Sequence, residues 1–521
     1  MGREKFWRSC CFLFIPVNVL SAGCKFKPQD LKRMKNLARY IFTLQVMLVA
    51  TAFPSHLVED KTTSFALGCF KVIPKSSIEK TISVQFFIEG DTINYRAETI
   101  IDSTYYGNYR ITGHRQLGID RFTMDNGENA VLISDYSTGI VRRLFQVGQN
   151  RFVMGPGFNT ASPAELTLTF IKDKEGLVKG ISLRNAKGIE QFAQRVQLRE
   201  EQVSFRNADA KLEGTLLIPS TKAPHPAVIL LHGSGSLSRY SFGPYPHFFT
   251  SLGFAVLIYD KRGAGSSSGT RVDASTGSAM KNSLYPDELV ADAMAAIRIL
   301  QQHEEIDSTK IGFWGSSEGG MLAMQVAARS QQVAFAINSS GFMEPLWQTL
   351  RYQAEAIPRS QGATSTQIDK EAAFVDLWLD VARTGKHWEN FERAQKELND
   401  AGHSWIFQSR GPFTSLDQLR WDWDHILTFD PLTALAKVHC PVLGVFGELD
   451  PYTPAQRTKE NMQRVLANAG HKDFTLKIFP KAGHSLSVLP EKNRMAPGVF
   501  GTLRTWLLAR TQTEEDSILH R

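Results

Sequence analysis

The segment 310–328 constrains the fold of this chain more than any other. A short apolar stretch, 310–314, runs into the pattern Gly-x-Ser-x-Gly, and an apolar, helix-like run follows directly. A serine on such a sharp strand-to-helix turn has a strained backbone and an exposed hydroxyl, and flanking glycines let the helix approach the strand. Ser317, between Gly315 and Gly319, is therefore the candidate nucleophile. Short patterns of this kind also arise by chance, so the other parts of a site must appear in the right order.

Apolar runs suited to buried parallel strands recur through the second half of the chain, with helix-like stretches between them. Residues 287–301, for example, place Leu289, Ala293 and Leu300 on one face, as an amphipathic helix does. Strands that alternate with helices predict an α/β domain with a doubly wound, mostly parallel sheet, and ligands bind such sheets at the carboxyl ends of the strands. The runs are residues 227–231, 254–259, 310–314, 333–337, 442–446 and 474–479.

The region before about residue 200 has a different pattern, in which strands are separated by short turns. Residues 82–100 alternate apolar and polar side chains around a turn at Gly90 and Asp91, and the stretches 166–170 and 177–183 flank another turn. Antiparallel sheet buries one face of each hairpin, so we expect a β-rich sandwich or small barrel. No catalytic constellation is evident in this region. We expect a structural role, with interaction or substrate guiding as the alternative.

About a hundred residues separate the apolar runs 333–337 and 442–446, far more than a simple crossover needs. Helical periodicity in 368–382 and 388–398 predicts a mostly helical cap inserted over 345–425, covering the active site. The predicted domains are a leader (1–52), a β-rich domain (53–200), the first part of the α/β core (201–344), the helical cap (345–425), the second part of the core (426–510) and a flexible tail (511–521).

Two further strand ends carry residues that could act with Ser317. Asp450 stands at the tip of the fifth apolar run and is the candidate orienting carboxylate, whereas Glu448 sits where strand alternation points it to another face. Asp424 and Asp430 are weaker competitors, each more simply a helix cap or turn residue. His484, on the loop after the last run, is the candidate general base. The order Ser…Asp…His at three separate strand ends argues against a solvated loop histidine.

Five motifs together resemble the α/β-hydrolase superfamily, particularly its bacterial esterase branch with dienelactone-hydrolase-like and serine-aminopeptidase-like members. The resemblance covers roughly residues 203–508 and implies the α/β-hydrolase fold and a serine esterase. Ser316 stands where many relatives have histidine before the nucleophile, a departure that leaves the triad intact. The motif at 259–266 is a structural turn in such proteins and receives no chemical role. The motifs are the segments 231–235, 259–266, 315–320, 447–450 and 482–484.

The resemblance also implies where an oxyanion would be stabilised. The turn after the first apolar run contains His232, Gly233 and Ser234, at the place where an α/β hydrolase puts one oxyanion donor. The expected donors are the backbone N–H groups of Ser234 and of Glu318, the residue after the nucleophile. His232 precedes the serine in the chain, against the expected order, so we interpret it as a structural hydrogen-bonding group.

The expected reaction is acyl transfer to water. Ser317 attacks an ester carbonyl while His484 takes its proton, and Asp450 fixes the imidazole tautomer. A carboxylesterase acting on a small-molecule acyl ester is the first expectation, without metal or organic cofactor. A peptidase or amidase on the same scaffold is the alternative, because fold and triad do not determine the substrate. A non-catalytic binding protein that keeps the fold is a second alternative, against which an intact triad argues.

The basic charge of the chain belongs to its leader. The formal net charge is +7, and residues 1–52 contain nine basic and two acidic residues, so the remainder is neutral. A body without basic bias gives no reason to expect nucleic acid as a partner.

The leader contains two candidate export signals. One ends at Cys24 and approximates a lipoprotein signal, with its leucine one place too far upstream. The other starts at Met34, where Lys35 and Arg39 precede a short apolar core, and ends in an A-x-A site at Ala52. The second fits better, so we expect translation from Met34, cleavage after Ala52 and export to the periplasm or medium of a bacterium. Neither apolar run approaches the ~20 residues of a membrane-spanning helix.

Cleavage at that site leaves two cysteines, Cys69 and Cys440. In an oxidising compartment they could pair, and two independently buried thiols are at least as good an interpretation. Neither has a neighbour at metal-ligand spacing.

Overall fold

The computed structural model divides into two units, Met1–Asp102 and Ser103–Arg521. The leader and Cys69 lie outside the described residues, so the cleavage site, export and the pairing of Cys69 with Cys440 stay predictions. The structure describes residues 83–89, 92–98, 103–112, 115–124, 127–161, 163–272, 285–401 and 413–511.

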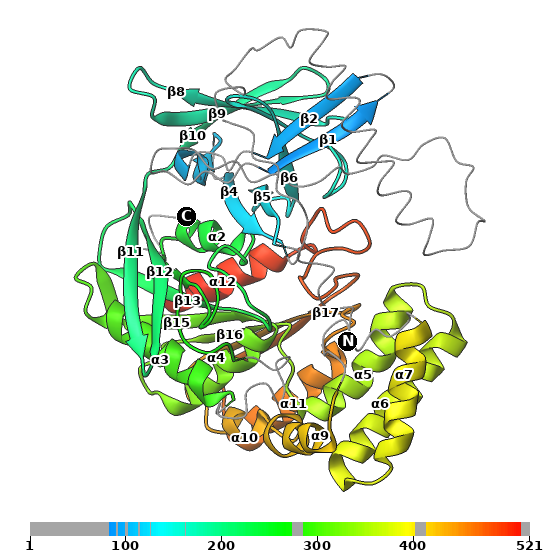
Figure 1. The fold of residues 1–521 in the computed structure, drawn as a ribbon. Coiled ribbons are helices and arrows are strands. Elements are labelled where there is room, and N and C mark those ends of the chain that lie inside the picture. The colour runs from blue at the N-terminus through cyan, green and yellow to red at the C-terminus, as the bar shows by residue number, and fades with distance from the viewer. Residues whose placement is uncertain are drawn as a thin grey trace. The chain divides into compact units, whose positions relative to one another are not determined.

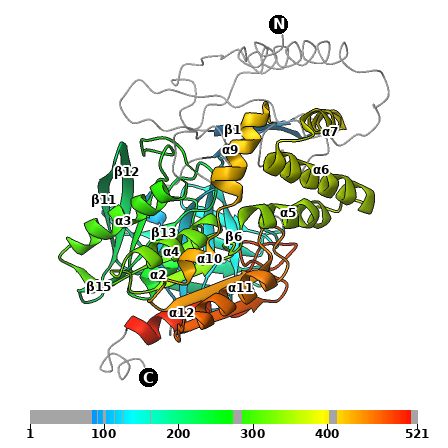
Figure 2. The same ribbon diagram turned by 90° about the horizontal axis from the view of Figure 1, so that it is seen from below.

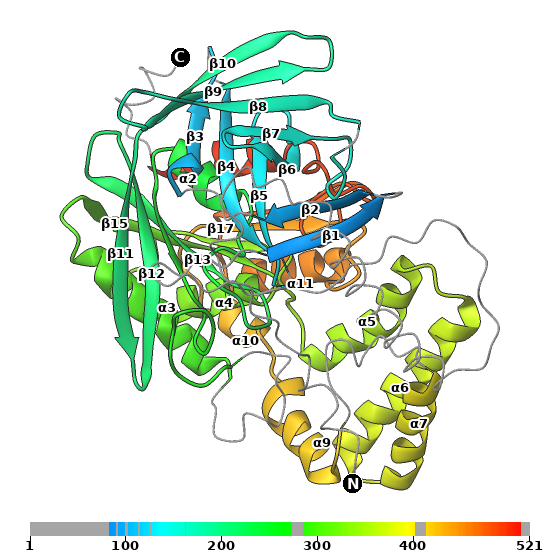
Figure 3. The same ribbon diagram turned by 45° about the horizontal axis from the view of Figure 1, so that its top comes forward.

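The described part of the first unit is an antiparallel pair of strands. β1 (Ser83–Glu89) and β2 (Thr92–Glu98) pair along all seven residues of each (Figure 3). This confirms the two strands that the alternation in 82–100 predicts.

Eight antiparallel strands close into a barrel at the start of the second unit. Most strands pair with their neighbours in the chain, and the last, β10, closes the ring by pairing with both β9 and β3. In β8, Leu168 and Phe170 are buried while the residues on either side are more exposed, the period of two that a closed sheet requires. The β-rich antiparallel region is confirmed, and it is a barrel. Its strands are β3 (Gly107–Arg110), β4 (Gln116–Thr123), β5 (Asn129–Asp135), β6 (Val141–Gly148), β7 (Arg151–Met154), β8 (Leu166–Lys172), β9 (Val178–Asn185) and β10 (Glu190–Arg195).

A second sheet of eight strands has the order β11-β12-β14-β13-β15-β16-β17-β18 (Figure 1). The pairings from β14 to β18 are parallel, but β12 pairs antiparallel with both β11 and β14. The sheet is therefore mixed, because a hairpin forms the edge of a parallel arrangement. Its strands are β11 (Leu198–Asn207), β12 (Ala210–Pro219), β13 (His225–Leu231), β14 (Ala255–Tyr259), β15 (Ile306–Ser316), β16 (Ala336–Ser339), β17 (Val442–Gly447) and β18 (Phe474–Phe479).

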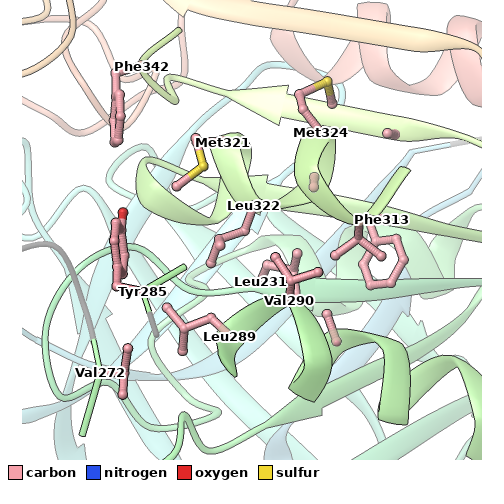
Figure 4. Close-up of a cluster of buried hydrophobic side chains, with 14 of the residues drawn as sticks. Leu231, Val272, Tyr285, Leu289, Val290, Phe313, Met321, Leu322, Met324 and Phe342 are labelled. Carbon is pink, nitrogen blue, oxygen red and sulfur yellow. The ribbon is translucent and has the colours of Figure 1, made fainter. Parts of the chain in front are cut away.

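Helices cover both faces of this sheet, which explains why its central strands are apolar throughout. In β13, Ala227 and Ile229 pack into one buried cluster, and Val228 and Leu230 pack into the cluster on the other face. Figure 4 shows the first cluster, with side chains of α3 and α4 beside strand residues. That face holds α3 (Asp287–Gln301), α4 (Glu318–Arg329), α10 (Leu432–Leu435) and α11 (Ala455–Asn468), and the other holds α2 (Tyr245–Ser251) and α12 (Val499–Thr511).

The barrel packs against the α2 and α12 side of the second sheet. Leu132 of β5 and Val141 of β6 belong to the same buried cluster as Phe248 of α2 and Phe500 of α12. Tyr136 places its ring edge-on to both phenylalanines, with centroids 5.3 Å from each. The barrel and the α/β part therefore share one core.

A helical segment lies between β16 and β17, and its members lie together in each view (Figures 1 and 2). Two of its helices contain the stretches 368–382 and 388–398, whose periodicity predicts helix. Trp378 is fully buried within the segment, with its ring centroid 4.9 Å from that of Phe413. The helices are α5 (Leu346–Ser360), α6 (Ser365–Thr384), α7 (Trp388–Ala401) and α9 (Leu416–Asp422), followed by a π-helical turn, Trp423–Leu427.

Among the described residues, the helices do not combine the length and the apolar character that crossing a bilayer requires.

Candidate active site

Ser317 occupies the sharp turn between β15 and α4. Its φ of 56° and ψ of −123° are sparsely populated by residues other than glycine, so the backbone is strained as expected. The flanking glycines make the turn possible: a Cβ on Gly315 would lie 1.9 Å from the Gly319 carbonyl oxygen, and one on Gly319 would lie 2.2 Å from the Leu231 carbonyl oxygen. The Ser317 N–H donates to the Ser339 carbonyl at 2.8 Å, which ties the turn to the end of β16.

Asp450 and His484 meet at the neighbouring strand ends. His484 Nδ1 lies 2.7 Å from Asp450 Oδ2, although 34 residues separate them. The other carboxylate oxygen, Oδ1, accepts the backbone N–H groups of Tyr452 at 2.8 Å and Thr453 at 3.0 Å. Asp450 is almost completely buried, whereas a quarter of the His484 side chain is exposed. The pair therefore combines a fixed carboxylate with an accessible imidazole.

The topology gathers the three predicted residues at one edge of the sheet. Ser317 follows β15, Asp450 follows β17 and His484 follows β18, and these strands belong to one parallel succession. The carboxyl ends of parallel strands share an edge, where ligands bind such sheets.

The turn after β13 lies directly against the serine. A Cβ on Gly233 would lie only 3.3 Å from the Cβ of Ser317, so glycine permits this approach. Because Leu231 is paired in register with Gly315, the turn containing Ser234 and the turn containing Ser317 leave the sheet side by side. The predicted oxyanion donors thus lie on two adjoining segments.

A buried ion pair joins these two segments, and sequence reasoning missed it. Lys261 Nζ lies 2.6 Å from Glu318 Oε2 and also donates to the Gly233 carbonyl at 2.9 Å. Both side chains are almost completely buried, at 4% and 0% exposed. The segment 259–266 was expected to have only a structural role. The sequence signal for this ion pair was Glu318, the acidic residue directly after the serine. A carboxylate buried at the start of a helix requires a positively charged partner.

His232 is the structural group that its place in the chain predicts. Its ring is buried, 4.3 Å from that of Phe242, and its Nε2 lies 3.1 Å from the Ser238 carbonyl. Burial, and then the charge of Lys261, lower the pKa of His232 to about 3. It is therefore a neutral imidazole at physiological pH that suits a hydrogen-bonding role, and so low a pKa makes it a poor general base.

Two of the competing acids accept backbone hydrogen bonds, and Asp424 is an exposed residue inside the π-helical turn and not a helix cap. Glu448 is exposed and accepts the backbone N–H of Lys481 at 2.9 Å. Asp430 accepts the N–H of Leu432 at 3.0 Å, as a turn residue does. Within the described residues, no group of three His, Cys, Asp or Glu side chains is arranged to hold a metal ion. Cys440 is half-buried, and burial raises the pKa of its thiol to about 12.

The model of the alpha/beta hydrolase fold family matches residues 226–489, about half of the chain. The chain therefore belongs to the α/β hydrolase family. An uncharacterized 31.7 kDa protein of Escherichia coli from the traX-finO intergenic region is 26% identical over 47% of this chain and 79% of its own length. The esterase EstD of Thermotoga maritima is 28% identical over 32% of this chain and 39% of its own length.

Among solved structures, the Pyrococcus furiosus esterase Pf2001 is 15% identical, with 61% of this chain and 92% of that chain covered and a TM-score of 0.37.

Proposed function

We propose that this protein is a serine hydrolase that cleaves carboxylic esters through Ser317, His484 and Asp450. The observation that carries the proposal is a strained serine between a parallel strand and a helix, with a hydrogen-bonded Asp–His pair at neighbouring strand ends. Two curated relatives, EstD and the Klebsiella pneumoniae protein FrsA, are named esterases, which supports ester hydrolysis as the reaction class.

The proposed reaction has two halves. Ser317 Oγ attacks the ester carbonyl while His484 Nε2 takes the hydroxyl proton, because Nδ1 faces Asp450. The resulting oxyanion accepts hydrogen bonds from the N–H groups of Ser234 and Glu318. The tetrahedral intermediate then collapses and the bond to the alcohol breaks. The departing alcohol takes the proton from His484, and the acyl group stays bonded to Ser317 as an acyl-enzyme. Water then gives a proton to His484 and its oxygen attacks the acyl carbon. The bond from that carbon to Ser317 Oγ breaks, the acid is released, and Oγ takes the proton back from His484.

We also propose that the helical segment between β16 and β17 is a cap that contributes to substrate choice. Its first helix, α5, is attached to the loop that carries the catalytic acid. Tyr352 donates its hydroxyl to the Asp450 carbonyl at 2.6 Å, and Gln353 Nε2 donates to the Tyr452 carbonyl at 2.8 Å. A movement of α5 would therefore be transmitted directly to the loop that holds Asp450.

Export from the cell is part of the same hypothesis, since its support is the signal-like segment from Met34 to Ala52. Amino-terminal sequencing of the protein recovered outside the cytoplasm should begin at Phe53. A chain that begins at Cys24 would favour lipoprotein processing instead.

The direct test is hydrolysis of short p-nitrophenyl acyl esters by the purified protein. Ser317→Ala should lower kcat by about 10⁶, because the nucleophile of a triad acts as a unit with its base. The neighbouring Ser316→Ala is the matched control and should keep most of the activity with the same unfolding temperature. Absence both of turnover and of labelling by a fluorophosphonate in the wild type would reject the catalytic proposal. Faster turnover of matched p-nitroanilides than of esters would favour an amidase.

A further inference from the structure

The buried ion pair between Lys261 and Glu318 reaches both proposed oxyanion donors. Lys261 follows β14, whereas Glu318 is the first residue of α4, so the contact joins elements that are far apart in the sequence. One ammonium group contacts the Glu318 carboxylate at 2.6 Å and the Gly233 carbonyl at 2.9 Å. Glu318 supplies one of the proposed oxyanion donors through its own backbone N–H. The Gly233 carbonyl belongs to the same peptide unit as the other proposed donor, the N–H of Ser234.

The Gly233 contact determines the direction of an N–H group. The carbonyl of Gly233 and the N–H of Ser234 belong to one peptide unit, which is planar, and in the usual trans form these two groups point in opposite directions. A carbonyl held against the Lys261 ammonium therefore directs the Ser234 N–H away from Lys261. Without that hydrogen bond, rotation of this peptide in a glycine-containing turn costs little, because glycine has few steric restrictions.

Stability is a poor explanation for such a pair. Removing two charges from water costs several kcal/mol per ion in proteins, and buried ion pairs often contribute no net stability compared with apolar side chains of similar size. Lys261 and Glu318 are both nine-tenths or more buried, at 4% and 0% exposed. A pair of this kind is better explained by the groups that it orients.

We propose that Lys261 is a positioning residue of the oxyanion hole, which holds the Gly233–Ser234 peptide with its N–H toward the reacting carbonyl and fixes the start of α4 through Glu318. This inference rests on the proposed function, since it assigns a role within the same site. Lys261 does not contact substrate. Its effect is on the energy of the tetrahedral intermediate, in which the oxyanion depends on donors that are already aligned.

The variant that tests the role is Lys261→Met, which removes the ammonium and keeps most of the side-chain length. One misaligned oxyanion donor costs about 10²–10³ in kcat, so we expect a loss of that size with KM within about threefold of the wild type. A boronic acid that forms a tetrahedral adduct with the serine should bind more weakly by the same factor as kcat/KM falls. If Lys261 contributed only to stability, the folded variant would keep both the wild-type kcat/KM and the wild-type affinity for the boronic acid.

Two further variants keep the test decisive if the single variant unfolds. Lys261→Met combined with Glu318→Leu removes both charges, so no unpaired ion stays buried, and kcat should still fall by at least about tenfold. The matched control removes the adjacent buried pair with Arg262→Met and Asp292→Leu. Arg262 Nε lies 2.7 Å from Asp292 Oδ2, and both side chains are 2% exposed. Arg262 also contacts Glu288 at 2.7 Å, but that carboxylate is 29% exposed and stays hydrated when Arg262 is removed. None of the three residues is part of the proposed site. This control should change the unfolding temperature and leave kcat within about threefold.

Each outcome has one meaning. A folded Lys261 variant with wild-type kcat and boronate affinity overturns the inference, as does failure of both Lys261 variants to fold, which would assign the pair to stability. An equal loss of kcat in the Arg262 control also overturns it. Failure of the proposed function is recognised separately, because wild-type protein would then neither hydrolyse esters nor react with a fluorophosphonate at Ser317.

Discussion

Two Asp–His pairs of nearly equal geometry occur in the described part of the chain. At the sheet edge, His484 Nδ1 lies 2.7 Å from Asp450 Oδ2, and between the barrel and the α/β part, His247 Nδ1 lies 2.6 Å from Asp120 Oδ1. Asp120 is on β4 of the barrel and His247 is on α2, so this second pair joins two parts of the shared core. Geometry of the pair alone does not distinguish a catalytic dyad from a structural one.

The surroundings of the two carboxylates do distinguish them. Asp450 receives two backbone N–H groups on the oxygen that does not face the imidazole, which are charge-assisted hydrogen bonds to a carboxylate. The corresponding oxygen of Asp120, Oδ2, has no hydrogen-bond partner among the described residues. Burial raises the pKa of Asp120, and the contact with His247 opposes that effect. Asp450 therefore has hydrogen-bond partners on both carboxylate oxygens, whereas burial disfavours the charged form of Asp120.

The two imidazoles also differ, in how far each is exposed to solvent. A quarter of the His484 side chain is exposed, at the edge where Ser317 also lies, whereas the His247 side chain is only 7% exposed. A base must reach both the serine and the substrate, which a buried ring in a packed junction cannot do. The proposed site is therefore supported by the strained serine and the peptide donors around Asp450, and the Asp–His contact by itself does not identify it.

The largest expected difference between the pairs is in turnover. Asp450→Asn should lower kcat by about 10⁴, because the amide favours the wrong imidazole tautomer while the packing is kept. Asp120→Asn, the matched change at the junction, should leave kcat within about threefold. Steady-state kinetics on one ester substrate, with circular dichroism of both variants, measures the contrast. Similar losses in the two variants would remove the functional distinction between the pairs.

The second expected difference is in stability. His247→Ala leaves the Asp120 carboxylate buried without its partner, so the free energy of unfolding should fall by about 3–5 kcal/mol, while kcat of the folded protein is kept. Denaturant unfolding of the full chain measures the change. His484→Ala, at the partly exposed site, should lower stability far less.

A double variant checks the cause of that loss. If the unpaired charge is responsible, His247→Ala with Asp120→Asn should be more stable than His247→Ala alone, since the interaction energy of contacting residues is not additive. Simple addition of the two single effects would instead attribute the loss to the cavity left by the ring.

The central strands and the order of the site could be predicted from the sequence, for a physical reason. Parallel strands buried on both faces are apolar throughout, so the six runs correspond to β13–β18, and the residues after their ends share one edge. Each such signal is local. The mixed character of the sheet was not predictable, because β12 pairs with β14 through a contact that no local pattern encodes.

The partners of the buried charged groups were also beyond sequence reasoning. Lys261 and Glu318 are 57 residues apart and come from a strand end and a helix start, with no spacing rule that relates them. Asp120 and His247 are 127 residues apart and lie in a barrel and a helix. A charge in the sequence indicates only that a buried carboxylate needs a partner, and the fold decides which partner it receives.

A third histidine sharpens the comparison, because His232 is buried without an acid directly bonded to its ring in the described contacts. Burial lowers its pKa to about 3, so the folded protein holds the neutral form down to that pH, while the unfolded chain takes up a proton near pH 6.5. The unfolded state then binds more protons between these values. Stability contributed by His232 is therefore complete above pH 6.5 and is lost as pH falls toward 3, by up to about 1.4 kcal/mol per pH unit.

His232→Gln should flatten that slope, since glutamine can still donate to the Ser238 carbonyl but does not titrate. Between pH 6.5 and 5 the wild type should lose about 2 kcal/mol more than the variant, measured by denaturant unfolding at each pH. Asp120 acts in the opposite direction, because its raised pKa makes its contribution fall as pH rises from about 4, so the comparison is made between variants and not on the wild-type slope alone. Equal slopes in the two proteins would mean that His232 accepts a proton in the folded state, and its assignment as a neutral structural group would be wrong.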